Sequence, residues 1–169
     1  MKDSTLVFCY GLELNLTLLH CVVGGPKPVA AGCARLRGFS RAWNVAGHLP
    51  NLAVHADGLV EGALVRLTAI QFQRLSGARL VPALYLWRRV TVMGPLLRRR
   101  QALTLWSPQG HTSGAPGLSV WSEVVLGALQ QGLSDAAILD LLRLRPNDRL
   151  EIERRWARPF PTPSLLSAA

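Results

Sequence analysis

The chain has 169 residues, of which 49% are apolar and 17% are charged. This composition is too apolar for a disordered protein, and the length suits one domain with a buried core. The most apolar stretch, residues 5–24, is interrupted by Glu13, Asn15 and His20, so we expect no membrane-spanning helix and no membrane partner. The first residues lack the basic region of a signal peptide, and a cytoplasmic location is therefore predicted.

Basic residues outnumber acidic ones by 19 to 10, which gives a net charge of +9, and 17 of the basic residues are arginine. Residues 62–122 contain eight arginines, including the cluster Arg98-Arg99-Arg100, and no Asp or Glu. Such a segment attracts anions, which can be carboxylates, phosphates or an acidic partner. Because the chain shows no helix-turn-helix, zinc-finger or interleaved aromatic–basic pattern, a basic nucleic-acid-associated protein is the least favoured of the functions considered.

Three cysteines, Cys9, Cys21 and Cys33, are present. An odd number without C-x-x-C spacing indicates neither a zinc site nor a complete set of disulfides. We expect free thiols in a reducing compartment, and no metal or organic cofactor is predicted.

The first half of the chain reads mainly as strands. Residues 5–10 form an apolar, partly β-branched run that ends at Gly11, and glycine and proline at 24–28 indicate a loop. Successive strands are predicted over 29–36 and 38–44, followed by a shorter extended piece over 51–55. Asp57-Gly58 indicates a turn before a further strand over 59–67.

Helices enter in the second half. Thr68 is a candidate N-cap of a short helix that ends near Gly77, an extended segment lies within 80–93, and residues 100–106 form another strand before a loop over 107–117. Apolar residues recur at helical spacing between Trp121 and Leu129, and Ser134 can cap a second helix. A third helix is predicted over 149–158, before a poorly ordered tail over 159–169. The prediction is a single α+β domain over 1–158.

Several segments, in this order, resemble the γ-glutamylcyclotransferase-like (AIG2-like) superfamily. Phe8-Cys9-Tyr10-Gly11-Leu12-Glu13-Leu14 is similar to its opening "YGSNL" signature, and residues 29–44 are similar to its "A.L.GY...FN" segment. Residues 59–67 are similar to the "V.G.VY.L" strand, Arg74-Leu75-Ser76-Gly77 lies where the family has "LD..EG", and residues 121–133 are similar to "Y...I..GA...GL". The resemblance covers about 140 residues.

The resemblance implies a small, closed, mixed β-barrel with flanking helices and a cavity at one end. In the family, backbone N–H groups of the Tyr-Gly loop hold the γ-glutamyl group. A glutamate moves the proton that lets the α-amine attack the γ-carbonyl and release 5-oxoproline. This is acyl-transferase or lyase chemistry that needs no cofactor.

Two departures put the activity in question. The position of the family's glutamate is occupied by Ser76, whose hydroxyl is no base without an activating neighbour, and no carboxylate lies nearby in the sequence. The serine and asparagine of the signature are replaced by Leu12 and Glu13. Backbone donors over residues 11–14 can survive that change, because an N–H group does not depend on its side chain.

Three functions remain open, and the least favoured of them is the basic nucleic-acid-associated protein. In one, the protein is an enzyme acting on a γ-glutamyl or related amide compound with a displaced acid/base residue. Glu13 is the first candidate and Glu61 the second, although Glu13 can also point out of its turn and Glu61 into solvent. In the other, the fold is a non-catalytic binding module for an anionic small molecule or a peptide carboxylate, held by arginines. The predicted binding residues are Tyr10, Gly11, Leu12, Leu14 and Tyr85.

Overall fold

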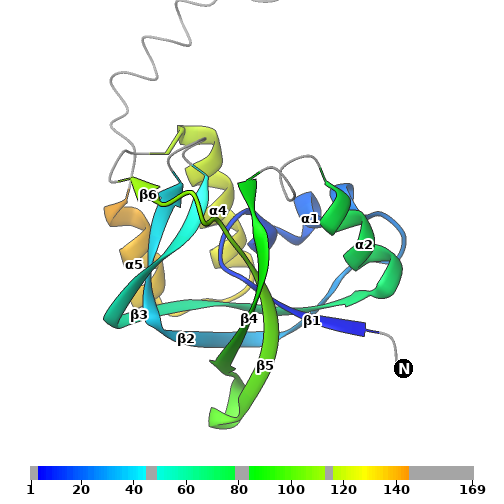
Figure 1. Cartoon of the computed structure of the whole chain (residues 1–169), viewed down its shortest axis with the longest axis horizontal. Coiled ribbons are helices and arrows are strands. Elements are labelled where there is room, and N and C mark those ends of the chain that lie inside the picture. Colours follow the sequence, from blue (N-terminus) through cyan, green and yellow to red (C-terminus); the bar gives the residue numbers. More distant parts are fainter. Residues whose placement is uncertain (1–3, 45–48, 79–83, 113–115, 145–169) are drawn as a thin grey trace, which may run out of the picture.

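The computed structural model describes residues 4–44, 49–78, 84–112 and 116–144 (Figure 1). The strands are β1 (Ser4–Cys9), β2 (Val29–Asn44), β3 (Pro50–Thr68), β4 (Leu86–Met93), β5 (Arg99–Trp106) and β6 (His111–Thr112). The helices are α1 (Leu16–Val23), α2 (Ala69–Gly77), α4 (Leu118–Gln130) and α5 (Asp135–Arg143), with short 3-10 helices η1 (Leu12–Leu14) and η2 (Pro95–Leu97).

Five strands close into a barrel. The sheet order is β3-β1-β5-β4-β2-β6, and a further pairing of β3 with β2 joins the ends of the first five strands. β1 pairs with β5 in parallel, whereas the other neighbours are antiparallel. The predicted α+β class, with a small mixed β-barrel and flanking helices, is confirmed. Figure 1 shows α1 and α2 beside one part of the barrel and α4 and α5 beside another.

The segments predicted as four separate strands form two long ones, β2 and β3. The predicted turn at Asp57-Gly58 is wrong, because the chain continues along β3. Val54 pairs with Phe39 and Leu59 pairs with Arg37, so residues 55–58 bulge opposite Gly38, whose φ is 81°. The bulge bends the strand pair around the barrel without ending it. The Asp57-Gly58 pair therefore lies in a bulge of β3 and not in a hairpin turn.

Side-chain caps explain where the helices begin. Thr68 and Gln71 form a capping box at the start of α2, and the Ser134 hydroxyl accepts a hydrogen bond from the first turn of α5, as predicted. α1, over part of a segment left without a structure prediction, is capped by Asn15, whose side chain accepts hydrogen bonds from the N–H groups of Thr17 and Leu18.

Both faces of β1 are buried, which accounts for its continuous apolar sequence. Val7 and Cys9 pack into a cluster with the helices, whereas Phe8 and Tyr10 point into the barrel and pack against β2, β3 and β4. β1 thus joins the barrel interior to the helical layer. The Tyr10-Gly11 loop follows directly at the carboxyl end of β1.

Some predictions fall outside the described residues. They are the third helix over 149–158, the tail over 159–169 and with them the domain boundary at 158, and the start of the extended segment over 80–93, of which the structure describes β4. No helix in the described ranges is long and apolar enough to cross a membrane.

Candidate functional site

A cavity of about 430 Å³ opens between α1, α2 and the end of β5. The loop between β1 and α1 contributes Leu12 and Glu13, and Tyr85 lies in its wall. The cavity therefore lies beside the Tyr10-Gly11 loop, through its neighbours Leu12 and Glu13. Its other described lining residues are Leu18, Leu19, Cys21, Val22, Leu49, Pro50, Leu75, Ala78 and Leu105.

The Tyr10-Gly11 loop is fixed from two sides. The Tyr10 hydroxyl donates a hydrogen bond of 2.8 Å to the carbonyl of Leu105, and the Tyr10 carbonyl accepts one from the Arg41 guanidinium. A Cβ atom on Gly11 would lie 2.8 Å from the Cβ of Pro50, so only glycine fits without a shift of the neighbouring chain. The Tyr10 side chain is buried and serves to hold the loop against β5.

Glu13 lies in the cavity wall, half-buried, so its carboxyl group does not point away from the turn into solvent. Burial raises the pKa of Glu13 above its ordinary value, while hydrogen bonds from the backbone N–H groups of Glu13 and Gly11 and the charge of Arg41 oppose that rise. A carboxyl group with a raised pKa exchanges a proton more readily near neutral pH than an exposed one. The position and the proton chemistry both make Glu13 the strongest acid/base candidate in the cavity.

Tyr85 and Leu14, both predicted to bind ligand, are placed differently. Tyr85 lines the cavity, and its hydroxyl donates a hydrogen bond of 2.6 Å to the carbonyl of Pro50. The Leu14 side chain is fully buried in the core between the barrel and the helices. Its backbone N–H donates to the Gly11 carbonyl at 3.0 Å, so that donor is used within the turn. Leu14 therefore supports the loop from behind.

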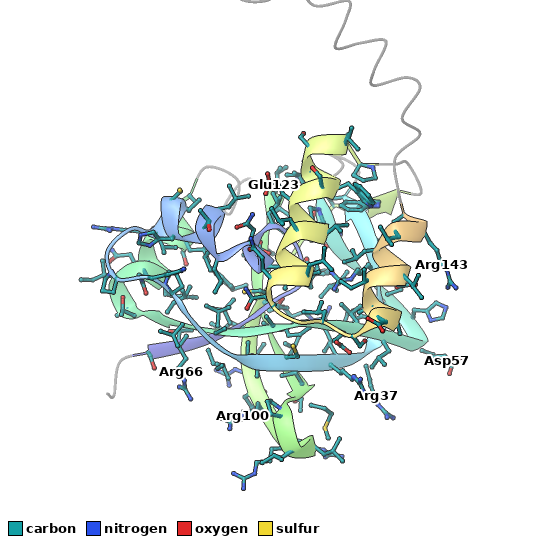
Figure 2. The ribbon with its side chains drawn as sticks, turned by 180° about the vertical axis from the view of Figure 1, so that it is seen from behind. Arg37, Asp57, Arg66, Arg100, Glu123 and Arg143 are labelled. Carbon is teal, nitrogen blue, oxygen red and sulfur yellow. The ribbon has the colours of Figure 1, made fainter. Side chains whose placement is uncertain are left out.

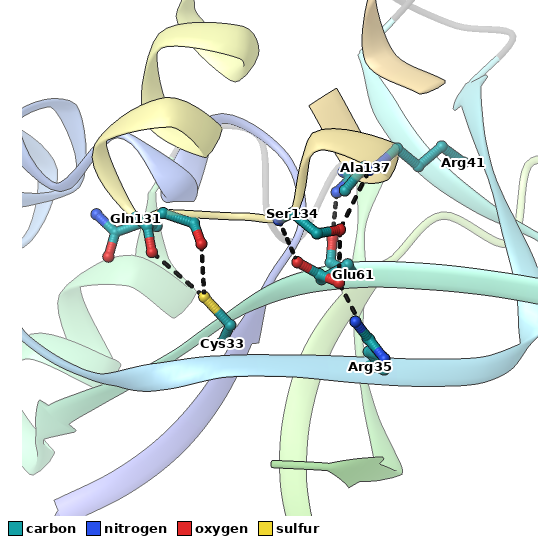
Figure 3. A network of polar contacts seen from close by, with 8 residues as sticks. Cys33, Arg35, Arg41, Glu61, Gln131, Ser134 and Ala137 are labelled. Carbon is teal, nitrogen blue, oxygen red and sulfur yellow. Dashed lines mark hydrogen bonds and ion pairs between the residues drawn. The ribbon is translucent and has the colours of Figure 1, made fainter. Parts of the chain in front are cut away.

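Glu61, the second acid/base candidate, lies in a different place (Figure 3). Its side chain is 9% exposed, forms an ion pair of 3.0 Å with Arg35, and accepts hydrogen bonds from the N–H (2.6 Å) and hydroxyl (3.1 Å) of Ser134. Desolvation alone would raise the pKa of Glu61, but these hydrogen bonds and the Arg35 charge lower it below its ordinary value. The expectation of a solvent-facing side chain is wrong, and Glu61 does not line the cavity beside Glu13.

Ser76, which the resemblance predicts to occupy the position of the family's glutamate, lies on α2. The Ser76 hydroxyl donates to the carbonyl of Phe72 at 2.8 Å and accepts from the indole N–H of Trp87 at 2.8 Å. The first bond lies within α2 and the second joins α2 to β4. Ser76 is not among the described residues that line the cavity. Neither of these two partners, a carbonyl oxygen and an indole N–H, is a base that would activate the hydroxyl.

No described arginine of the basic segment lines the cavity. Arg88 packs its guanidinium over the rings of Phe39 and Trp106 at 5.2 and 5.1 Å. Figure 2 shows Arg66 and Arg100 on the side of the barrel remote from the helices. Among the described residues that line the cavity there is no arginine or lysine. The predicted arginine contacts to an anionic ligand therefore have no counterpart in the described wall of this cavity, whereas Arg35 and Arg41 line a separate hollow together with Glu61 and Asp140.

Sequence reasoning missed the apolar wall and the arginine beneath the loop. α1 supplies four of the lining residues, and its one visible signal was an asparagine before an apolar run. Arg41 lies on β2 and donates to the carbonyls of Tyr10 and Glu61. Burial lowers the pKa of Arg41 to about 10. Because the partners of Arg41 are backbone carbonyls, which every residue has, no sequence pattern predicts this contact.

No cluster of His, Cys, Asp and Glu side chains that could hold a metal occurs within the described ranges. The three cysteines there are free thiols, of which Cys9 is buried and Cys21 exposed.

No protein-family model and no curated protein matches the chain. Several solved structures share its fold. A Homo sapiens structure, described as an uncharacterized protein, has a TM-score of 0.77 at 19% identity and covers 87% of this chain and 91% of that one. A gamma-glutamyl cyclotransferase has a TM-score of 0.77 at 19% identity, covering 86% and 90%. YkqA from Bacillus subtilis has a TM-score of 0.70 at 22% identity, covering 84% and 54%.

Proposed function

We propose, for a chain that has the fold of the γ-glutamylcyclotransferase-like proteins, that it acts on a γ-glutamyl or related amide compound, with Glu13 as a displaced acid/base residue. The observation that carries the proposal is the place of Glu13, the one acidic side chain among the described residues that line the cavity. The fold shared with a gamma-glutamyl cyclotransferase supports the substrate class.

In the proposed reaction, one carboxylate relays a proton. Glu13 accepts a proton from the α-ammonium of the substrate, and the free amine attacks the γ-carbonyl carbon. A new C–N bond closes the five-membered ring of 5-oxoproline while the original amide C–N bond breaks. The ring nitrogen loses a second proton as it becomes an amide. Both protons pass to the leaving amine, one of them through Glu13, so the amine departs as an ammonium and charge and atoms balance without a cofactor. The raised pKa of Glu13 suits this exchange, because a more basic carboxylate removes the ammonium proton more readily.

The test is to incubate the purified protein with γ-glutamyl amines, γ-glutamyl dipeptides and glutathione and to search for 5-oxoproline by mass spectrometry. We expect product from at least one compound, and we expect Glu13→Gln to abolish it while the melting temperature changes little. Asp57→Asn is the matched control, because Asp57 is exposed on the bulge of β3. Full turnover in Glu13→Gln, with loss in Glu61→Gln, would assign the proton transfer to the second candidate instead.

A second candidate function is a non-catalytic binding module. It is supported by the hydrogen bonds that the N–H groups of Gly11 and Glu13 donate to the Glu13 carboxylate, since these donors are then engaged before any substrate binds. For a binding module we expect a ligand to raise the melting temperature by mass action without any product. The cytoplasmic location stays a prediction, which the free thiols support.

A further inference from the structure

The hairpin between β4 and β5 ends in an exposed apolar tip. Leu96 and Leu97, in η2, are 86% and 79% exposed, more than any other large apolar side chain in the described ranges. Figure 1 shows this hairpin extending below the rest of the barrel, on the side away from the helices. Single exposed leucines are ordinary, but an adjacent pair at a projecting point is an apolar surface that another molecule can cover.

The tip is held in one conformation from its base. The Gly94 N–H donates to the Arg98 carbonyl at 2.9 Å, which closes the loop. A Cβ atom on Gly32 of β2 would lie 2.8 Å from the Pro95 ring, so the loop also rests against β2. The Leu96-Leu97 pair has φ angles of 57° and 55°, in the left-handed region that leucine rarely adopts. Since both side chains are exposed, their own packing does not offset this cost, and backbone strain of this kind is typical of functional loops.

Arginines flank the apolar tip. The Arg98-Arg99-Arg100 cluster follows it directly, and all three residues are exposed. The strands beside the tip, β2, β4 and β5, contain no Asp or Glu, whereas Glu123, Asp135 and Asp140 lie on α4 and α5. Figure 2 shows Arg100 and Glu123 on opposite sides of the molecule. The tip therefore has a positive potential that no carboxylate of these strands reduces.

Projecting leucines with arginines behind them fit an anionic membrane surface. Apolar side chains enter the boundary between headgroups and acyl chains, while guanidinium groups stay at the headgroups and pair with their phosphates. A nucleic acid would use the arginines but has no apolar interior to receive the leucines, and residues 94–100 include no aromatic side chain to stack on bases. We propose that the tip of the β4–β5 hairpin docks the protein on anionic phospholipid bilayers, with Leu96 and Leu97 inserted and the arginine cluster on the headgroup phosphates.

This inference goes beyond the proposed function, because the tip and the cavity are at opposite ends of β5. Arg99 begins β5 at the tip and Leu105 lines the cavity, and six residues of a strand span about 20 Å. A tip inserted by about 5–10 Å therefore leaves the cavity outside the bilayer. The expectation of no membrane partner was based on the lack of a membrane-spanning segment, which peripheral binding does not need.

The test is co-sedimentation of the full-length protein with vesicles of phosphatidylcholine alone and with vesicles of which about one third is phosphatidylserine. We expect the partition coefficient to be at least about tenfold higher for the anionic vesicles, since each arginine near such a surface contributes about fivefold. Binding to the anionic vesicles should fall between about 0.1 M and about 0.5 M NaCl, because salt screens the attraction.

A double substitution tests the leucines without removing the loop. Leu96→Asn with Leu97→Asn replaces the apolar side chains by a residue that tolerates a left-handed backbone, so the fold is kept. We expect the partition coefficient of this variant to fall at least about tenfold. Leu126→Gln with Leu129→Gln is the matched control, because these leucines are also exposed but lie on α4, and it should bind fully.

A second pair of variants tests the charge. Arg99→Gln with Arg100→Gln is expected to lower the partition coefficient at least about tenfold. Arg143→Gln, an exposed arginine on α5, should leave it unchanged. Circular dichroism confirms that each variant is folded.

Equal binding to the two kinds of vesicle, or binding to neither, would overturn the inference. Full binding by the double leucine variant would also overturn it, because charge alone would then account for the attraction. Binding to single-stranded RNA or to polyglutamate without binding to anionic vesicles would assign the arginines to another partner and overturn it too. The 5-oxoproline assay separates this inference from the proposed function: turnover without vesicle binding would keep only the function, and vesicle binding without turnover would keep only the inference.

Discussion

Gly127 is the point where α4 crosses the loop that carries Glu13. A Cβ atom built on Gly127 would lie 2.4 Å from the backbone nitrogen of Asn15 and 2.6 Å from the carbonyl carbon of Leu14. Both atoms belong to the main chain where η1 meets α1, so no side-chain rotation relieves the overlap. Gly127→Ala therefore requires α4 and η1 to separate, and the loop beside the cavity is displaced with η1.

The size of the effect follows from two opposing terms. Alanine in place of a helical glycine ordinarily stabilises by about 1 kcal/mol, whereas overpacking a tight contact costs about 1–3 kcal/mol. The upper part of that range, about 2–3 kcal/mol, applies here because both overlapping atoms are main-chain atoms. We expect a net loss of about 1–2 kcal/mol, which for a domain of this size lowers the melting temperature by roughly 2–8 °C. Thermal unfolding followed by circular dichroism measures it.

Gly77→Ala is the matched control. Gly77 ends α2 and a Cβ there would meet nothing within 4 Å, so this variant should be as stable as the unmodified protein or slightly more stable. If Gly127→Ala were equally well tolerated, the close approach of α4 to η1 would be refuted.

Three other substitutions test single contacts. Glu61→Gln should cost about 1–3 kcal/mol at pH 7 in urea unfolding. Because the native pKa of Glu61 lies below 4.5, its contribution is present above that pH and disappears as the pH falls through the native pKa, and a loss independent of pH would contradict the ion pair. Tyr10→Phe removes the buried bond to the Leu105 carbonyl and should cost about 1 kcal/mol, whereas unchanged stability would mean that the bond contributes nothing. Ser76→Ala leaves the Trp87 indole N–H without its acceptor, so tryptophan fluorescence and stability (about 1–2 kcal/mol) should change. Turnover in Ser76→Ala should not change. A loss of turnover in this variant would assign a catalytic role to Ser76.

The elements that local chemistry specifies were predictable. Thr68 and Ser134 cap the helices that they were predicted to cap, and the order of the segments that resemble the γ-glutamylcyclotransferase-like proteins predicted the barrel. The extent of β2 and β3 was not predictable, because glycine and aspartate at 57–58 suit a hairpin turn as well as a bulge. Only the pairing of β3 with β2 on both sides of the bulge decides between them.

The candidate site was predictable in its loop and not in its walls. Glu13, Leu12 and Tyr85 line the cavity, whereas Tyr10 and Gly11 are not among its described lining residues. Leu14 and Glu61 are directed elsewhere, by core packing and by the start of α5. These outcomes depend on contacts between residues far apart in the sequence, which periodicity and spacing do not encode. The chemical roles of the lining residues stay predictions.

The parallel pairing of β1 with β5 has a consequence for how the chain is made. Two side-chain hydrogen bonds connect this part of the chain with β5. The hydroxyl of Tyr10, the residue after β1, donates to the Leu105 carbonyl, 95 residues away, and the Thr104 hydroxyl donates to the Phe8 carbonyl, 96 residues away. β1 precedes β5 in the chain, so one edge of β1 stays unpaired until β5 has been made. Contacts of such separation form slowly, and an apolar unpaired edge invites association between chains. Synthesis at low temperature or with a chaperone should therefore raise the yield of folded protein, because the cavity beside Tyr10 is complete only after the last barrel strand arrives.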